Sequence, residues 1–96
     1  MDPVVLINPV EVSEENEIPF LEKWILCTRE LRRRPGFISI RLHRSVDASQ
    51  RFRFVMVQQW QSEDDARSAI QFIVEKLARQ DFPSQHSPGL FRVFSH

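Results

Sequence analysis

The centre of the chain alternates apolar and polar side chains in the way of two β-strands joined by a loop. From Ile38 to Leu42 every second side chain is aliphatic and those between them are polar, a period of two that predicts a strand with one buried face. Residues 52–60 are richer in aromatic and β-branched side chains, which indicates a strand buried more deeply in a sheet. Asp and Ser in the segment between them favour a turn, so a β-hairpin is predicted over residues 37–60.

Helical spacing of apolar side chains predicts a first helix before this hairpin. Its apolar stripe consists of Phe20, Trp24, Cys27 and Leu31. A proline such as Pro19 is tolerated in the first turn of a helix but not in its interior. This favours Asn16 over Ser13 as the N-cap, although Ser13 is also a good capping residue. The pair Pro35-Gly36 ends this helix.

A second helix is predicted to follow the hairpin. Ser62 is suited to the N-cap position, and Asp65 stands where a capping box places its acid. The apolar face of this helix consists of Ala66, Ala69, Ile70, Ile73 and Leu77.

The two ends of the chain complete the predicted sheet. Residues 4–12 form a first strand, and Pro9 places part of it near an edge or a bulge because proline cannot donate a ladder hydrogen bond. Residues 83–89 are predicted to form a loop, and residues 90–94 a short final strand. The order β-α-β-β-α-β indicates one domain over residues 1–96 with a ferredoxin-like α+β fold, in which both helices cover one face of a four-stranded antiparallel sheet.

Both faces of this sheet carry apolar side chains. Phe54, Met56 and Trp60 point to one face, and Val55 and Val57 point to the other. Because the helices cover one face only, we expect a second copy of the chain to cover the other face, which predicts a homodimer.

Composition narrows the class of protein. Thirteen basic and thirteen acidic residues cancel, whereas a nucleic-acid surface usually shows a basic excess. The single cysteine, Cys27, cannot form an internal disulfide and indicates a reducing compartment, so a cytoplasmic protein is expected. The apolar run 4–12 is too short for a membrane span or signal peptide. The sequence contains no metal-binding or nucleotide-binding motif.

Several short motifs, in order along nearly the whole chain, resemble the antibiotic biosynthesis monooxygenase family. They are Leu6 to Val12, Phe20-Leu21 with Trp24, Arg34 to Phe37, Leu42 to Ser45, Arg51 to Val55 with Trp60, and Pro88 to Phe91. The resemblance implies a dimeric α+β barrel with a small-molecule cavity between helices and sheet. Members of this family include cofactor-independent oxygenases that convert phenols to quinones, and haem-degrading enzymes.

The resemblance transfers to individual residues only in part. Trp60 matches a strand tryptophan used by the quinone-forming members, but Met56 stands where those members have an asparagine. Asn8 matches the first-strand asparagine of the haem-degrading members. Their tryptophan on the second helix is missing here, and His86 is the one candidate for their histidine.

These matches define a candidate site. Trp60 and Asn8 are the expected catalytic residues. The expected ligand-binding residues are Phe20, Trp24, Phe54, Met56 and His86. Each has a structural alternative, because buried aromatic residues and methionine most often pack a core, and an asparagine beside a proline often satisfies local backbone. The segment Arg32 to Arg34 is suited either to an anionic ligand or to capping of the helix C-terminus.

The resemblance therefore suggests a cofactor-independent monooxygenase for a small aromatic or polyketide-like substrate, with no metal and no other cofactor. One alternative is a non-catalytic dimeric module that binds a small hydrophobic molecule. A haem-degrading enzyme is a further alternative. No nucleic-acid or membrane partner is expected.

Overall fold

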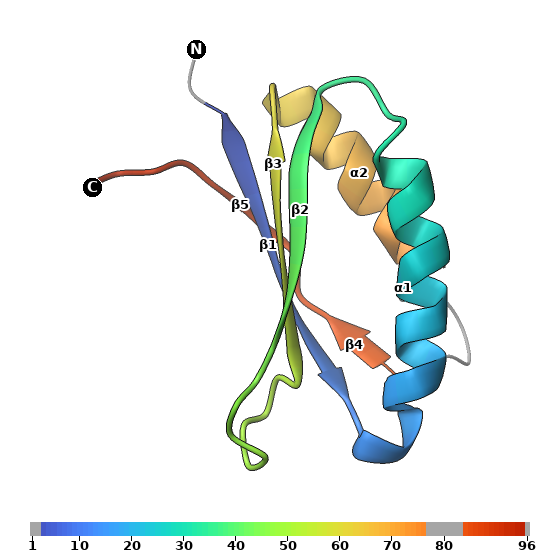
Figure 1. Cartoon of the computed structure of the whole chain (residues 1–96). Helices are drawn as coiled ribbons and strands as arrows, with labels where there is room; N and C mark the ends of the chain where they lie inside the picture. Colours follow the sequence, from blue (N-terminus) through green and yellow to red (C-terminus); the bar gives the residue numbers. More distant parts are fainter. Residues whose placement is uncertain (1–2, 77–83, 96) are drawn as a thin grey trace.

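The computed structural model describes residues 3–76 and 84–95, which form an α+β fold with two helices on one face of an antiparallel sheet (Figure 1). The elements are β1 (Val4–Val12), the 3₁₀-helix η1 (Glu14–Asn16), α1 (Glu17–Leu31), β2 (Phe37–Arg44), β3 (Phe54–Trp60), α2 (Glu63–Lys76), β4 (Ser84–His86) and β5 (Gly89–Phe91). The strand order is β2-β3-β1-β4, and β5 also pairs with β1. The predicted ferredoxin-like order is confirmed, with the final strand divided in two.

Local chemistry explains where the helices begin and end. Pro19 lies in the first turn of α1, three residues after its N-cap Asn16, as predicted. Helix α1 ends at Leu31 with Arg32 as its C-cap, before the predicted stop at Pro35-Gly36. Gly36, with φ of 82°, turns the chain into β2 in the left-handed region, which glycine adopts without steric cost. Ser62 caps α2, because its Oγ accepts the Asp65 backbone N–H at 3.1 Å and donates to the Asp65 carboxylate at 2.9 Å.

The strands correct three of the predicted details. Strand β3 begins at Phe54 rather than at residue 52. Ile38 is 41% exposed because the register of β2 against β3 shifts between Phe37 and Ser39, which leaves it outside the pleat alternation. The last strand ends at Phe91 rather than at residue 94. The Leu77 position of the predicted second helix lies outside the described residues.

The predicted loop 83–89 is wrong for residues 84–86 and 89. Strands β4 and β5 pair with β1 in one continuous register, interrupted only at Ser87 and Pro88. The Ser87 N–H donates to the Pro9 carbonyl at 3.3 Å. The N–H and C=O of a strand residue point to the same neighbouring strand. The position where Pro9 lacks an N–H therefore faces this interruption in the pairing. Pro9 therefore lies on a central strand, not at the expected edge, and the break accommodates its missing donor.

The core lies between the sheet and the helices. The even-numbered residues of β1 and β3 are buried beneath the helices, and the odd-numbered ones of β1 are half-buried on the opposite face. Of the predicted α1 stripe, Phe20, Cys27 and Leu31 are buried and Trp24 packs against them at partial exposure. Ala66, Ala69 and Ile73 of α2 are fully buried.

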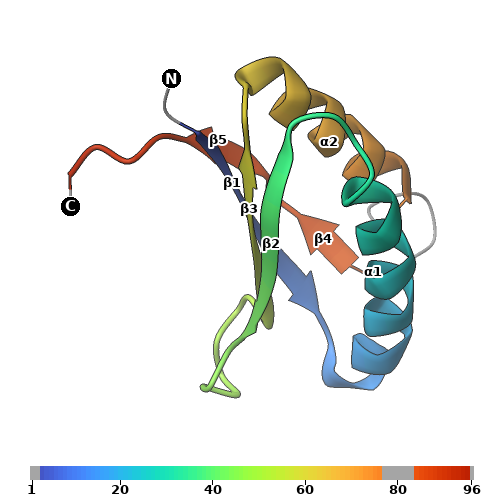
Figure 2. The same ribbon diagram turned by 45° about the horizontal axis from the view of Figure 1, so that its top comes forward.

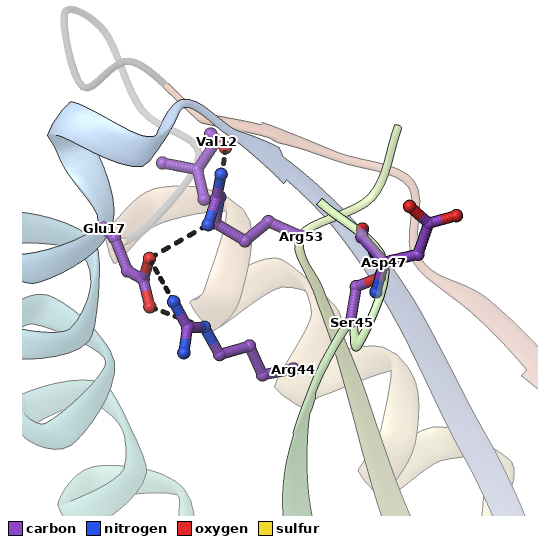
Figure 3. A network of polar contacts seen from close by, with 6 residues as sticks. All are labelled: Val12, Glu17, Arg44, Ser45, Asp47 and Arg53. Atoms are coloured by element: carbon purple, nitrogen blue, oxygen red, sulfur yellow. Dashed lines mark hydrogen bonds and ion pairs between the residues drawn. The ribbon is translucent and has the colours of Figure 1, made fainter. Parts of the chain in front are cut away.

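A partly buried ionic network fixes the start of α1 against the hairpin (Figure 3). The Glu17 carboxylate pairs with Arg44 Nε at 2.8 Å and with Arg53 Nη1 at 3.1 Å. Arg53 Nε also donates to the Val12 carbonyl at 3.3 Å. The network therefore ties the ends of β1, β2 and β3 to the first turn of α1, one turn before Phe20 enters the core. Among residues 3–76 and 84–95, neither helix is long and apolar enough to cross a membrane.

Candidate functional site

The buried face of the sheet carries two polar groups among apolar side chains. Asn8 and Gln58 are both fully buried, one on β1 and one on β3. Burial of an amide is costly unless its donors and acceptors are satisfied. Each of the two groups therefore has to be explained by its partners.

Asn8 forms the first group with His86, a residue 78 positions later in the chain. Asn8 Nδ2 lies 3.1 Å from His86 Nδ1, and Asn8 Oδ1 accepts the Ser87 backbone N–H at 3.1 Å. His86 faces the helices because β4 pairs it with Val10, whose side chain is buried. Figure 2 shows β4 beneath α1, so the pair lies at the edge of the sheet under that helix.

These hydrogen bonds determine the tautomer of His86. A backbone N–H can only donate, so the contact with Ser87 makes the facing amide atom of Asn8 the oxygen. The other amide atom is therefore the nitrogen, which donates to His86 Nδ1. Nδ1 is an acceptor without a proton, so the neutral ring carries its proton on Nε2, which lies 3.0 Å from Ser84 Oγ and donates to it.

Burial reinforces the neutral state of this ring. Desolvation lowers the pKa of His86 from 6.5 to about 4, because the cationic form is disfavoured away from water. At neutral pH His86 is therefore a fixed hydrogen-bond donor through Nε2 and a weak base.

Two stacked aromatic side chains lie on one side of the Asn8–His86 pair. The Phe20 ring stacks on Phe54 with 5.1 Å between centroids and lies 6.2 Å from the His86 ring. Three of the predicted ligand-binding residues, Phe20, Phe54 and His86, are thus brought together with Asn8. This arrangement is a flat apolar wall beside two polar groups.

Trp60 belongs to the second polar group. Its Nε1–H donates to Gln58 Oε1 at 2.9 Å, and Gln58 Nε2 lies 3.4 Å from Met56 Sδ. Trp60 pairs with Val4 in the sheet, four residues from Asn8 along β1, which is about 13 Å at the usual strand rise. The structure therefore does not place the two expected catalytic residues in one contact, and the N–H of Trp60 already has a partner.

The remaining two candidates lie on either side of the core. Met56 is directly opposite Asn8 in the register of β1 and β3 and is fully buried. Trp24, on α1, has a buried indole N–H for which the described residues provide no hydrogen-bond partner. Among the described residues, no group of three or more His, Cys, Asp or Glu side chains is arranged to hold a metal ion.

Two polar residues at this site were missed from the sequence. Gln58 could have been identified, because strand alternation places it on the same face as Met56 and Trp60. Ser84 could not, because its position depends on the pairing of β4 with a strand far away in the sequence.

Comparison with known proteins gives the family of this fold. The sequence profile of the family described as antibiotic biosynthesis monooxygenase matches residues 3–69. Comparison with curated protein sequences returns no match. A proposed monooxygenase from Shewanella loihica PV-4 is similar in structure, with 30% identity, a TM-score of 0.82, and coverage of 99% of this chain and 97% of that one.

Two further solved structures share the fold at lower identity. SnoaB from Streptomyces nogalater, a cofactor-independent oxygenase, has 23% identity and a TM-score of 0.80, with 100% of this chain and 97% of that chain covered. The haem-degrader MhuD from Mycobacterium tuberculosis, solved with two haems in its active site, has 23% identity and a TM-score of 0.71, with 98% of each chain covered. The resemblance inferred from the sequence motifs is therefore confirmed, and the chain belongs to the antibiotic biosynthesis monooxygenase family.

Proposed function

We propose that the chain is a cofactor-independent monooxygenase whose substrate is a small aromatic or polyketide-like phenol bound beneath α1. The observation that supports this proposal most directly is the Asn8–His86 pair, held in one tautomer beside the Phe20 and Phe54 rings. Membership of the antibiotic biosynthesis monooxygenase family and the similarity to SnoaB support this reaction class.

The proposed reaction converts a phenol to a quinone with dioxygen. The ionised phenol transfers electrons to dioxygen, a C–O bond forms at a ring carbon, and the C–H bond at that carbon and the O–O bond break. One oxygen atom stays as the new carbonyl, and the other leaves as water. The protein's contribution is orientation and exclusion of water.

His86 has a defined part in this scheme. Its Nε2–H can donate to a developing phenolate oxygen when the Ser84 hydroxyl rotates away from it, while Asn8 keeps the opposite nitrogen unprotonated. Because the His86 pKa is about 4, the ring is a poor general base near neutral pH. The proposal therefore favours substrates whose hydroxyl group ionises readily without a strong base.

Trp60 takes part only if its indole N–H is released by Gln58. The Gln58 amide is held on its other side by Met56 Sδ, a weak acceptor, so rotation of this amide is the step that would make the Trp60 N–H available. In this proposal Trp60 and Asn8 serve opposite ends of one flat substrate.

A non-catalytic binding module is the second candidate. It is favoured by Met56, which stands where the quinone-forming members have an asparagine, and by the occupied N–H of Trp60. In that case the same apolar wall would hold a small hydrophobic ligand without chemistry.

Oxygen consumption separates the two candidates. The protein is mixed with a panel of hydroxylated naphthalenes and anthracenes, and dioxygen uptake is followed together with quinone absorbance. Substrate binding is measured by tryptophan fluorescence, which is simple to interpret because the chain has two tryptophans and no tyrosine.

We expect His86→Ala and Asn8→Ala to lower turnover at least about tenfold, the loss expected for one positioned hydrogen bond to a developing charge. His43→Gln is the matched control, because His43 is exposed. Substrate binding without dioxygen uptake would refute the proposed monooxygenase activity and support the non-catalytic binding module. A shifted haemin absorption band that depends on His86 would instead favour haem degradation.

A further inference from the structure

A groove between the two helices has no role in the proposed site. It has a volume of about 690 Å³ and is open to solvent, which lies within the range of small-molecule sites. Its apolar lining consists of Leu26, Cys27 and Phe72. Because the described lining residues come from α1, the turn that follows it and α2, and none comes from a strand, the groove is separate from the Asn8–His86 pair on the sheet.

Positive charge is concentrated around this groove. Among the described residues, its charged lining comprises Lys23, Arg29, Arg33 and Lys76 together with one acid, Glu30. The whole chain has no net charge, so this excess is local. Arg29 and Arg33 are exposed, and neither has an ion-pair partner among residues 3–76 and 84–95.

The structure gives each arginine of the Arg32–Arg34 segment a different environment. Arg32 lies over the Phe37 ring, with 5.7 Å from its guanidinium carbon to the ring centroid. Arg34 donates to Ser68 Oγ at 2.9 Å and lies 5.0 Å from the centroid of Phe72. Of these three, Arg33 is the one that lines the groove, and no ion pair of Arg33 is found among residues 3–76 and 84–95.

Phe72 is the centre of the apolar surface. Arg34 lies on its ring, and Lys76 Nζ lies 5.9 Å from its centroid. Leu26, on the facing helix, is 61% exposed. A ligand here would meet an aromatic ring and an aliphatic side chain, with cations at the rim.

We propose that this groove binds a small amphipathic anion, namely a flat apolar body that carries one carboxylate, sulfonate or phosphate group. The apolar body packs between Leu26 and Phe72, and the anion pairs with Arg29 and Arg33, whose guanidinium groups are suited to such oxygens. The occupant is a small molecule and not a protein helix, because among the described residues α2 lines the groove over about one turn, from Phe72 to Lys76, whereas a stable protein interface buries well over about 1,000 Å².

The test uses the fluorescent dye 1-anilinonaphthalene-8-sulfonate, which has this chemistry. Arg29→Gln/Arg33→Gln should weaken dye binding about tenfold, the equivalent of two surface charge contacts. The matched control Arg67→Gln/Arg92→Gln removes the same charge from exposed positions that do not line the groove, and should leave binding unchanged. Glu30→Gln should tighten it, and high salt should weaken it.

A second pair of variants locates the dye. Leu26→Glu places an acid in the groove and should abolish binding, whereas Ile25→Glu, at an exposed neighbouring position on α1, should not. Circular dichroism verifies that each variant is folded.

Two results would overturn the proposal. One is equal dye affinity in the Arg29/Arg33 variant and its control, or in the Leu26 and Ile25 variants. The other is binding of poly-L-glutamate in preference to the dye with the same dependence on Arg29 and Arg33, because the groove would then be a protein-docking surface.

Discussion

The half-buried His86 ring predicts a specific pH dependence of stability. Its pKa is about 4 in the folded chain and 6.5 by the reference value, so the unfolded chain binds a proton at a higher pH than the folded chain does. Between these two values the unfolded state carries more protons, and stability therefore rises with pH. The His86 contribution is fully present above pH 6.5 and is lost as the pH falls towards 4.

The magnitude follows from the pKa difference. The separation of 6.5 and about 4 corresponds to about 3 kcal/mol at 1.36 kcal/mol per pKa unit. Solvent screening of a partly exposed ring reduces this to about 2 kcal/mol. The geometry agrees in direction, because protonation of Nδ1 would set an N–H against the Asn8 amide nitrogen and abolish that hydrogen bond.

The assay is urea unfolding from pH 7 to pH 4, followed by tryptophan fluorescence. In His86→Gln the free energy of unfolding should change less between pH 7 and pH 4 than in the natural chain, by about 2 kcal/mol. In His43→Gln, which changes an exposed position, the pH dependence of that free energy should be the same as in the natural chain. All three proteins contain the same acidic residues, so the difference between their stability curves isolates His86. Equal slopes in the natural chain and His86→Gln, or a His86 ring that titrates near 6.5 by NMR in the folded protein, would refute the reasoning.

Three further predictions concern Asn8, Glu17 and the open sheet face. Asn8→Ala should lower the free energy of unfolding by about 2–3 kcal/mol, because His86 Nδ1 loses its donor and the Ser87 N–H keeps only its longer bond to Pro9. Urea unfolding measures this change, and a loss below about 0.5 kcal/mol would contradict the prediction. Glu17→Gln should cost about 1–2 kcal/mol in the same assay, since it removes the anion between two arginines, and raised salt should reduce that cost. Sedimentation equilibrium should give a molecular mass of about twice 11.4 kDa, because half-buried Val55 and Val57 leave an apolar sheet face that a second copy can cover. Val57→Lys should have the mass of the monomer. A natural chain that is itself monomeric would exclude the dimer.

Elements whose signals are local could be predicted from the sequence. The start of α2 depends on Ser62 and Asp65, which bond each other directly. The turn from α1 into β2 depends on Gly36 and its positive φ. Strands β1 and β3 bury their even-numbered side chains, and their odd-numbered ones are half-buried or exposed. Both strands are visible in the sequence as runs rich in apolar and β-branched side chains.

Strand β4 could not be predicted in this way. It is three residues long, prolines flank it at positions 83 and 88, and its pairing partner is β1. No local pattern distinguishes such a segment from a loop, because the ladder hydrogen bonds come from residues far away in the chain. For the same reason the contact of His86 with Asn8 could not be predicted, because it depends on that pairing.

Asn8 shows why its structural and functional interpretations do not exclude each other. Its oxygen accepts the Ser87 N–H at the point where the edge strand is interrupted, which is the local backbone role expected of an asparagine beside a proline. Because that bond fixes the amide orientation, its nitrogen must face His86 Nδ1, and the proton of the imidazole must then lie on Nε2. The structural bond is therefore the cause of the chemical state of His86. An Asn8→Asp variant should separate the structural role from the chemical one. Its carboxylate still accepts the hydrogen bond from Ser87, but it can only accept, not donate, at His86. The ring proton therefore shifts to Nδ1, and the neighbouring anion raises the His86 pKa.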